Sequence, residues 1–286
     1  MRSERALLFV GAHPDDESFG PGATLAKYAA EGVRVVYACA TRGEAGTVDT
    51  PHLRGFGSVG DLRWAELACA AEQLGLAAVV PLGYRDSGMA GAPDNHHPRA
   101  LVAAPPEEVT RDVVGTIRAV RPQVVITFDP LGGYRHPDHI AIHAATVRAF
   151  HAAEDPHRFP GAGPPFRPQK LYFWVPRRAS LRLTVRVLRL LGRDPARVGR
   201  NRDVDLADIA AVEFPVHARV RVGRGAVGQK HAAQACHLSQ LGGRGAVRRA
   251  LALAARCRAA RDLYMRAHPT PVAGSAAEAD LFEGVR

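Results

Sequence analysis

Two short clusters of titratable residues, AHPDDE at positions 12–17 and HPDH at positions 136–139, have the residue types needed for hydrolytic chemistry. In the first cluster, His13 and Asp16 are three residues apart, and Pro14 favours a turn by fixing its own φ. Both side chains could therefore reach one metal ion. A hydrolytic zinc site needs about three protein ligands and one open position for water, so this cluster offers two of the three ligands.

The remaining residues of the two clusters suit the other tasks of such a site. Asp15 is a free carboxylate beside the expected metal, as a general base requires, because zinc lowers the pKa of water towards about 7. Pro137 suits the first position of a helix and His136 its cap, so His136 and His139 would project near the helix start. One of them could bind metal while the other faces the substrate. Asp138 between them could orient an imidazole.

Strands and helices in alternation must position these clusters. Near-continuous apolar runs predict parallel strands that are covered on both faces, and amphipathic stretches between them predict helices, one with Asp61 as its cap. This order predicts a Rossmann-like, doubly wound, mostly parallel α/β sheet with helices on both faces. The predicted strands are 5–12, 33–41, 77–84 and 122–129, and the predicted helices are 22–32, 61–75 and 105–121.

A polar cluster follows each of the four predicted strands. Ligands bind beyond the carboxyl ends of parallel strands, and a purely structural sheet has no reason to collect polar groups at that edge. A single His-Pro-Asp is more typical of a turn with an Asp cap, but two copies at one sheet edge favour an active site. The four clusters are HPDDE, TRGEAG, YRDSGM and DPLGGYRHPDH.

The second half of the chain is expected to complete the same domain. Residues 1–151 form the predicted catalytic core, 152–268 a smaller α/β portion, and 269–286 a loosely held tail. The long loop at 85–106 suggests a binding loop or lid. Elements predicted in the second portion are strands at 170–176 and 211–220, a basic amphipathic helix at 178–192 and two later helices.

Composition narrows the functional classes. No apolar run of the 286 residues approaches the roughly 18 residues of a membrane span, so we expect a cytoplasmic protein with no membrane partner. The four cysteines are scattered without a CxxC pair, and we expect them to be reduced and buried. The net charge of +10 comes largely from arginine-rich stretches. These lack interleaved aromatic residues, so nucleic acid is not favoured as a partner.

The same motifs resemble those of a known family. AHPDDE and GGYRHPDH, together with TRGEAG, LRWAEL, GYRDSGM and KHAAQACHLSQ, are similar to motifs of the LmbE-like (PIG-L) family of zinc-dependent N-acetylglucosaminyl deacetylases. The similarity spans most of residues 5–242 and is nearest to family members of mycothiol metabolism. The resemblance implies that His13, Asp16 and His139 hold Zn²⁺, with Fe²⁺ as the alternative ion. It also implies that Asp15 is the general base.

Further roles are implied by the same resemblance. His136 would stabilise the oxyanion and protonate the leaving amine, and Tyr134 would help to polarise the carbonyl. Arg63 and Asp86 lie in stretches that meet the sugar in the family, where a guanidinium and a carboxylate suit hydroxyl groups. The implied activity is deacetylation of an N-acetylglucosamine-type amino sugar in a small-molecule conjugate. The alternatives are an amidase for a larger glucosaminyl amide, such as a mycothiol S-conjugate, and a basic nucleic-acid-binding or scaffold protein. The sequence is compatible with either a monomer or a homo-oligomer.

Overall fold

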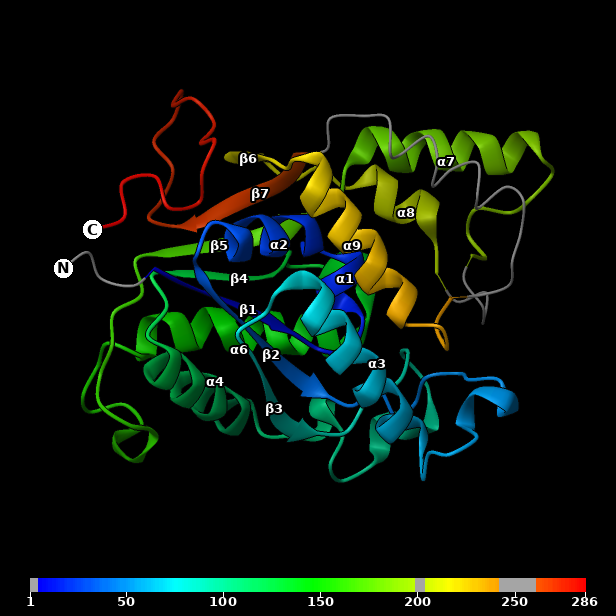
Figure 1. The fold of residues 1–286 in the computed structure, drawn as a ribbon, viewed down its shortest axis with the longest axis horizontal. Helices are drawn as coiled ribbons and strands as arrows, with labels where there is room; N and C mark the ends of the chain where they lie inside the picture. The colour runs from blue at the N-terminus through cyan, green and yellow to red at the C-terminus, as the bar shows by residue number, and fades with distance from the viewer. Residues whose placement is uncertain (1–4, 199–203, 242–260) are drawn as a thin grey trace.

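A mostly parallel sheet forms the centre of the computed structural model, which describes residues 5–198, 204–241 and 261–286 (Figure 1). Within these residues seven strands form one sheet in the order β3-β2-β1-β4-β5-β7-β6. The first five strands run parallel, whereas β7 pairs antiparallel with both β5 and β6. The predicted fold class is confirmed. The strands are β1 (Ala6–Gly11), β2 (Arg34–Thr41), β3 (Ala78–Tyr84), β4 (Val124–Phe128), β5 (Lys170–Val175), β6 (Ala218–Arg221) and β7 (Arg261–His268).

Helices cover both faces of this sheet (Figure 1). Leu7 and Phe9 of β1 point into the core under α2, α3 and α9, while Leu8 and Val10 point into the core under α4 and α6. Successive side chains of a strand face opposite sides, so burial on both faces explains the continuous apolar runs. The helices are α1 (Asp16–Phe19), α2 (Gly22–Ala30), α3 (Val59–Leu74), α4 (Pro106–Val120), α5 (Gly132–Arg135), α6 (Pro137–Ala152), α7 (Arg178–Leu190), α8 (Leu206–Ala211) and α9 (Arg224–Cys236), with short 3-10 turns η1 (Thr50–Leu53), η2 (Pro93–His96), η3 (Leu101–Ala103) and η4 (Pro160–Ala162).

The strand order places the two motifs side by side. From β1 the chain moves outward through β2 and β3, and it then returns to β4 on the other side of β1. The carboxyl ends of β1 and β4 are therefore neighbours at the point where the strand order reverses, which is where doubly wound sheets bind ligands. His13 follows β1, and His136 follows β4.

Several predicted boundaries were wrong. Ser58, not Asp61, caps α3, and its Oγ accepts the backbone N–H of Asp61 over 3.1 Å. The strand predicted at 211–220 is limited to Ala218–Arg221. The strand β7 was not predicted, because its partners β5 and β6 lie in distant parts of the chain. The second of the two later helices predicted from the sequence falls in part in 242–260, outside the described residues.

The cysteines and the tail also differ from expectation. Cys69 of α3 and Cys236 of α9 form a disulfide, whereas Cys39 is free and buried as expected. The fourth cysteine, Cys257, lies outside the described residues. The tail is anchored rather than loose: Leu281 is buried, and the Tyr28 hydroxyl donates to Asp280 Oδ1 over 2.7 Å. None of the helices in the described ranges is long and apolar enough to cross a membrane.

Candidate active site and metal centre

The loop after β1 presents His13 and Asp16 to the site. Gly11, the last residue of β1, lets the Tyr37 ring come close, since a Cβ at Gly11 would lie 2.8 Å from the Tyr37 hydroxyl oxygen. That hydroxyl donates to the carbonyl of His13 over 2.7 Å. Asp16 Oδ2 accepts the backbone N–H groups of Ala12 and His13 over 2.9 and 2.7 Å. The loop thus fixes one oxygen of Asp16 and leaves Oδ1 to face the second motif.

The second motif begins α6 as the sequence predicts. His136 is the N-cap, Pro137 occupies the first turn, and His136 Nδ1 accepts the backbone N–H of Asp138 over 3.2 Å. One turn of chain then places His139 against the first motif. Its Nδ1 faces the carbonyl oxygen of Gly132 over 3.0 Å. Since a carbonyl only accepts, His139 Nδ1 carries the proton and His139 Nε2 carries a lone pair.

Two ring nitrogens and the carboxylate of Asp16 come together where the motifs meet. His139 Nε2 lies 3.1 Å from His13 Nδ1 and 3.3 Å from Asp16 Oδ1, and His13 Nδ1 lies 3.9 Å from Asp16 Oδ2. A lone pair facing a carboxylate oxygen is repulsive unless a proton or a metal cation lies between them. One proton on His13 Nδ1 would satisfy the contact with His139 but not the contact between His139 and Asp16. A cation shared by all three groups removes both conflicts.

The donor set fits a zinc-type ion. Ligands bound to tetrahedral zinc at about 2.0–2.1 Å lie roughly 3.4 Å from one another, close to the separations seen here. All three side chains are buried, with 2 to 8% of their surface exposed. His136 extends the cluster, since its ring nitrogen lies within 4.8 Å of those of His13 and His139. Mixed imidazole and carboxylate donors also suit iron.

Asp138 and Asp86 hold the far side of the His13 ring. His13 Nε2 lies 3.1 Å from Asp138 Oδ2 and 3.4 Å from Asp86 Oδ1. Asp138 Oδ2 also accepts the backbone N–H of Ser87 over 2.9 Å. Burial lowers the pKa of His13, but these carboxylates outweigh it and raise the pKa well above its ordinary value. Burial likewise opposes ionisation of Asp86, yet His13 lowers the Asp86 pKa. The carboxylates keep the proton on Nε2 and turn Nδ1 towards the centre.

Asp15 lies beside the centre and is held by Arg63. Its Oδ2 accepts a hydrogen bond from Arg63 Nη2 over 3.1 Å, and Arg63 also donates to the carbonyls of Pro14 and Gly43. Burial raises the pKa of Asp15 to about 6, partly offset by the Arg63 charge and increased by Asp16. Arg63, predicted to meet the sugar, is 4% exposed and is bonded to the predicted base.

His136 and Tyr134 flank the centre. The His136 ring meets that of His13 edge-on with centroids 4.5 Å apart, and the Tyr134 ring meets that of His139 at 5.0 Å. Burial, together with the charges of His13 and His139, lowers the pKa of His136 to about 2. Because Nδ1 of the neutral ring accepts a backbone N–H, its proton is on Nε2, which makes that atom a hydrogen-bond donor.

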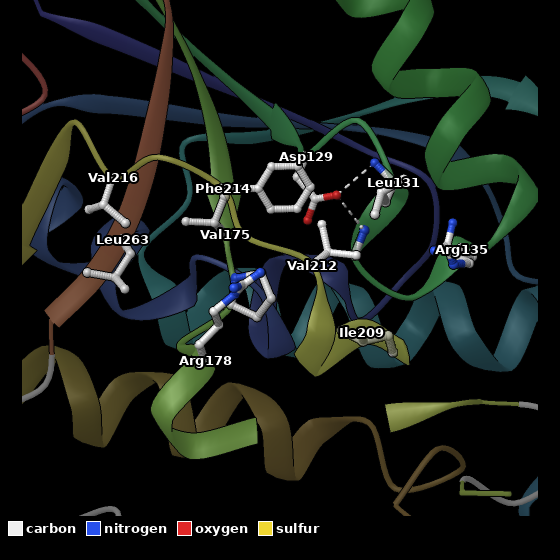
Figure 2. Close-up of a pocket in the computed structure, with 12 residues that line it drawn as sticks. Asp129, Leu131, Arg135, Val175, Arg178, Ile209, Val212, Phe214, Val216 and Leu263 are labelled. Atoms are coloured by element: carbon white, nitrogen blue, oxygen red, sulfur yellow. Dashed lines mark hydrogen bonds between the residues drawn. The ribbon is translucent and has the colours of Figure 1, made fainter. Parts of the chain in front are cut away.

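Two glycines form the turn that precedes Tyr134. A small cavity lies beside this turn. Gly132 and Gly133 have φ of 63° and 71°, and Asp129 Oδ1 accepts the N–H groups of Leu131 and Gly133. Figure 2 shows this carboxylate among apolar side chains, in a cavity of about 90 Å³. The apolar lining includes Val175, Val212, Phe214, Val216 and Leu263.

One pair near the centre escaped the sequence analysis. Glu17 Oε1 lies 2.7 Å from His237 Nε2, and neither side chain is exposed. The signal was the KHAAQACHLSQ stretch, but a single such stretch is equally typical of a packed helix end. His143, four residues after His139 on α6, faces the carbonyl of Phe128 and lies outside the converging set.

Fold and site together define a class, a hydrolase with an α/β fold built around a buried His/Asp centre suited to a metal ion. The family model described as GlcNAc-PI de-N-acetylase (PIG-L) matches residues 8–150. The chain belongs to this family, and it is an amide-hydrolysing enzyme of the deacetylase type.

Named relatives support the assignment. A 1D-myo-inositol 2-acetamido-2-deoxy-alpha-D-glucopyranoside deacetylase from Geodermatophilus obscurus is 40% identical over 250 residues, 84% of each chain. One of the same name from Streptomyces scabiei is 40% identical over 247 residues, 82% of this chain and 76% of the relative. N,N'-diacetylchitobiose deacetylase from Pyrococcus horikoshii shares the fold with a TM-score of 0.62 at 18% identity, covering 95% of this chain and 89% of the other. A conserved protein from Thermus thermophilus aligns with a TM-score of 0.58 at 26% identity, over 95% of this chain and 99% of the other.

Proposed function

We propose that this protein removes the acetyl group from an N-acetylglucosamine unit linked to inositol or a similar small aglycone, in the cytoplasm. The names of the relatives support the substrate class. The observation that carries the proposal is that the ring nitrogens His13 Nδ1 and His139 Nε2 lie close to each other and to the Asp16 carboxylate, an arrangement that would suit a shared cation. Zinc is the proposed ion and iron the alternative.

The metal, when bound by His13, Asp16 and His139, supplies Lewis acidity to the amide carbonyl and lowers the pKa of water. Asp15 is the proposed base that takes a proton from the attacking water. His136 Nε2–H points a donor at the oxygen that becomes negative, and Tyr134 is the proposed second donor. Such donors contribute roughly 3 to 4 kcal/mol each in studied enzymes.

The proton taken from the water and the proton given to the leaving amine balance within the same residues. The amine leaves only after it gains a proton, and the proton that Asp15 takes from the water balances this gain. His136 is the proposed donor to the amine, and because its neutral ring carries a single proton, the proton held by Asp15 must reach the ring as the Nε2 proton leaves. Asp86 and Arg63 remain the proposed sugar contacts. Arg63 is already bonded to Asp15, so a sugar hydroxyl would have to share its guanidinium.

The direct test measures metal content and acetate release together. Purified protein should contain about one equivalent of zinc or iron per chain, and it should release acetate from the inositol-linked N-acetylglucosaminide. A chelator should abolish turnover, and added zinc should restore it. Turnover that survives metal removal would overturn the metal centre. Failure to release acetate from a panel of N-acetylglucosaminides, with cleavage of a cysteinyl-glucosaminide instead, would replace deacetylation by the amidase reaction.

A further inference from the structure

The pair formed by Glu17 and His237 joins the catalytic loop to the helix α9. His237 Nε2 meets Glu17 Oε1 over 2.7 Å, and both side chains are fully buried. The other oxygen, Glu17 Oε2, accepts the backbone N–H of Asp15 over 2.9 Å. We propose that Glu17 and His237 are positioning residues, which hold the backbone of Asp15 in the orientation that its role as base requires. This inference rests on the proposed function.

The backbone of Asp15 is in a conformation that needs outside support. Its φ is 120°, which residues other than glycine rarely adopt. The carbonyl of Asp15 accepts the N–H groups of Ser18 and Phe19 over 3.0 and 2.8 Å, so its direction is fixed by α1. The N–H is fixed only by Glu17 among the described residues. The carbonyl of the same peptide, that of Pro14, accepts from Arg63 over 2.6 Å. Without the Glu17 acceptor this peptide would be held by Arg63 alone, and we expect it to tilt and to shift the Asp15 carboxylate.

Two elements thus act on Asp15 from different sides. Arg63 of α3 bonds the carboxylate, while His237, at the end of α9, acts on the backbone through Glu17. The buried Glu17 carboxylate needs a donor to stay in place, since a buried polar group without a partner is costly. Ser18 Oγ donates to Glu17 Oε1 as well, over 2.6 Å, but Ser18 belongs to the same loop. His237 is the donor to Glu17 that comes from another element.

A matched control separates positioning from helix packing. Gln234 lies on α9 three residues before His237, and its Nε2 donates to the carbonyl of Ser18 over 3.2 Å. Its contact reaches the same loop without reaching Asp15. If α9 merely packs against the loop, loss of either contact should have the same effect on turnover. If the Glu17–His237 pair positions the base, only the His237 change should lower kcat.

The experiment compares kcat, KM and metal content in three variants. His237→Leu is expected to lower kcat by about 10- to 100-fold, as seen for other outer partners of catalytic groups, with KM within about twofold and metal retained. His237→Gln, which keeps a donor for Glu17, should recover most of the loss. Gln234→Ala should behave as wild type. Should His237→Leu fail to fold, Glu17→Gln keeps the size, weakens both bonds, and should lower kcat with metal retained.

A second readout needs no substrate. In the metal-free protein, His237→Leu should speed amide hydrogen exchange in residues 12–20 and leave α6 unchanged. Equal kcat losses in His237→Leu and Gln234→Ala, metal loss in step with kcat, or unchanged exchange at 12–20 would each overturn the positioning role. An inactive wild-type protein would count against the proposed function alone, because the exchange comparison would still decide whether the pair holds the Asp15 backbone.

Discussion

At the scale of single residues, the geometry separates the base from the metal ligands. Asp15 faces Arg63, whereas His13, Asp16 and His139 face one another. Asp15→Asn should keep metal content at the wild-type level, because no converging atom is removed, and should lower kcat by roughly 10²- to 10⁴-fold. His139→Ala should lose both metal and turnover. Measuring metal content and acetate release for both variants checks these expectations. An active Asp15→Asn protein would show that Asp15 is not the base.

The hydrogen bond between Asp138 and His13 makes a different prediction. Asp138 Oδ2 fixes the proton on His13 Nε2, so that Nδ1 faces the centre. Asp138→Ala should therefore weaken metal binding by about 10- to 100-fold. Competition with a chromogenic chelator measures this affinity. Unchanged affinity in a folded variant would show that Asp86, the other carboxylate at His13, suffices to orient the ring.

At the scale of elements, the turn before α6 is where we expect a one-carbon substitution to lower activity and stability most. Gly132 has φ 63°, and a Cβ there would lie 2.6 Å from the Cβ of His139. Gly132→Ala should shift His139, lower kcat at least about tenfold and destabilise the protein by more than about 1 kcal/mol. Gly161→Ala is the matched control, since its Cβ would meet nothing within 4 Å. Denaturant unfolding and acetate release compare the two, and equal behaviour would contradict the close approach.

Local elements were largely readable from the sequence, and their pairings were not. The cap at His136 and the helix after Pro137 follow from a few adjacent residues. Ser58 was overlooked as the cap of α3, although Ser58 and Asp61 have the capping-box spacing. The strand β7 has partners that lie tens of residues away in the chain, so no local pattern identifies it. The same holds for the Cys69–Cys236 disulfide, whose residues are 167 positions apart.

At the scale of the whole molecule, Glu278 ties the end of the chain to the sheet. Its carboxylate accepts from Lys170 Nζ over 2.7 Å, and it also accepts from Tyr172 and Arg266. Burial alone would raise the Glu278 pKa, but the bonds from Lys170 and Tyr172 outweigh it and lower the pKa below its ordinary 4.5.

This lowered pKa predicts how stability depends on pH. A carboxyl whose folded pKa is depressed stabilises the fold above its unfolded pKa and loses that contribution as pH falls through the folded value. Glu278→Gln should therefore reduce the free energy of unfolding at pH 7 and flatten its decline below about pH 4.5. Urea titrations of both proteins across this range measure the effect. If the free energy of unfolding changed with pH in the same way in both proteins, Glu278 would not contribute to the pH dependence of stability.

The sequence by itself determined which chemical groups the site contains and that they lie at the carboxyl edge of the sheet. The residue types in AHPDDE and HPDH, and the run of apolar strands between polar turns, are set by neighbouring residues and by the two-sided burial of parallel strands. The tertiary structure alone decided the partners: Arg63 on Asp15, Asp138 on His13, and His237 on Glu17 across 220 positions. Such contacts form only when the packing of distant elements brings the groups together, and no local pattern in the sequence records them.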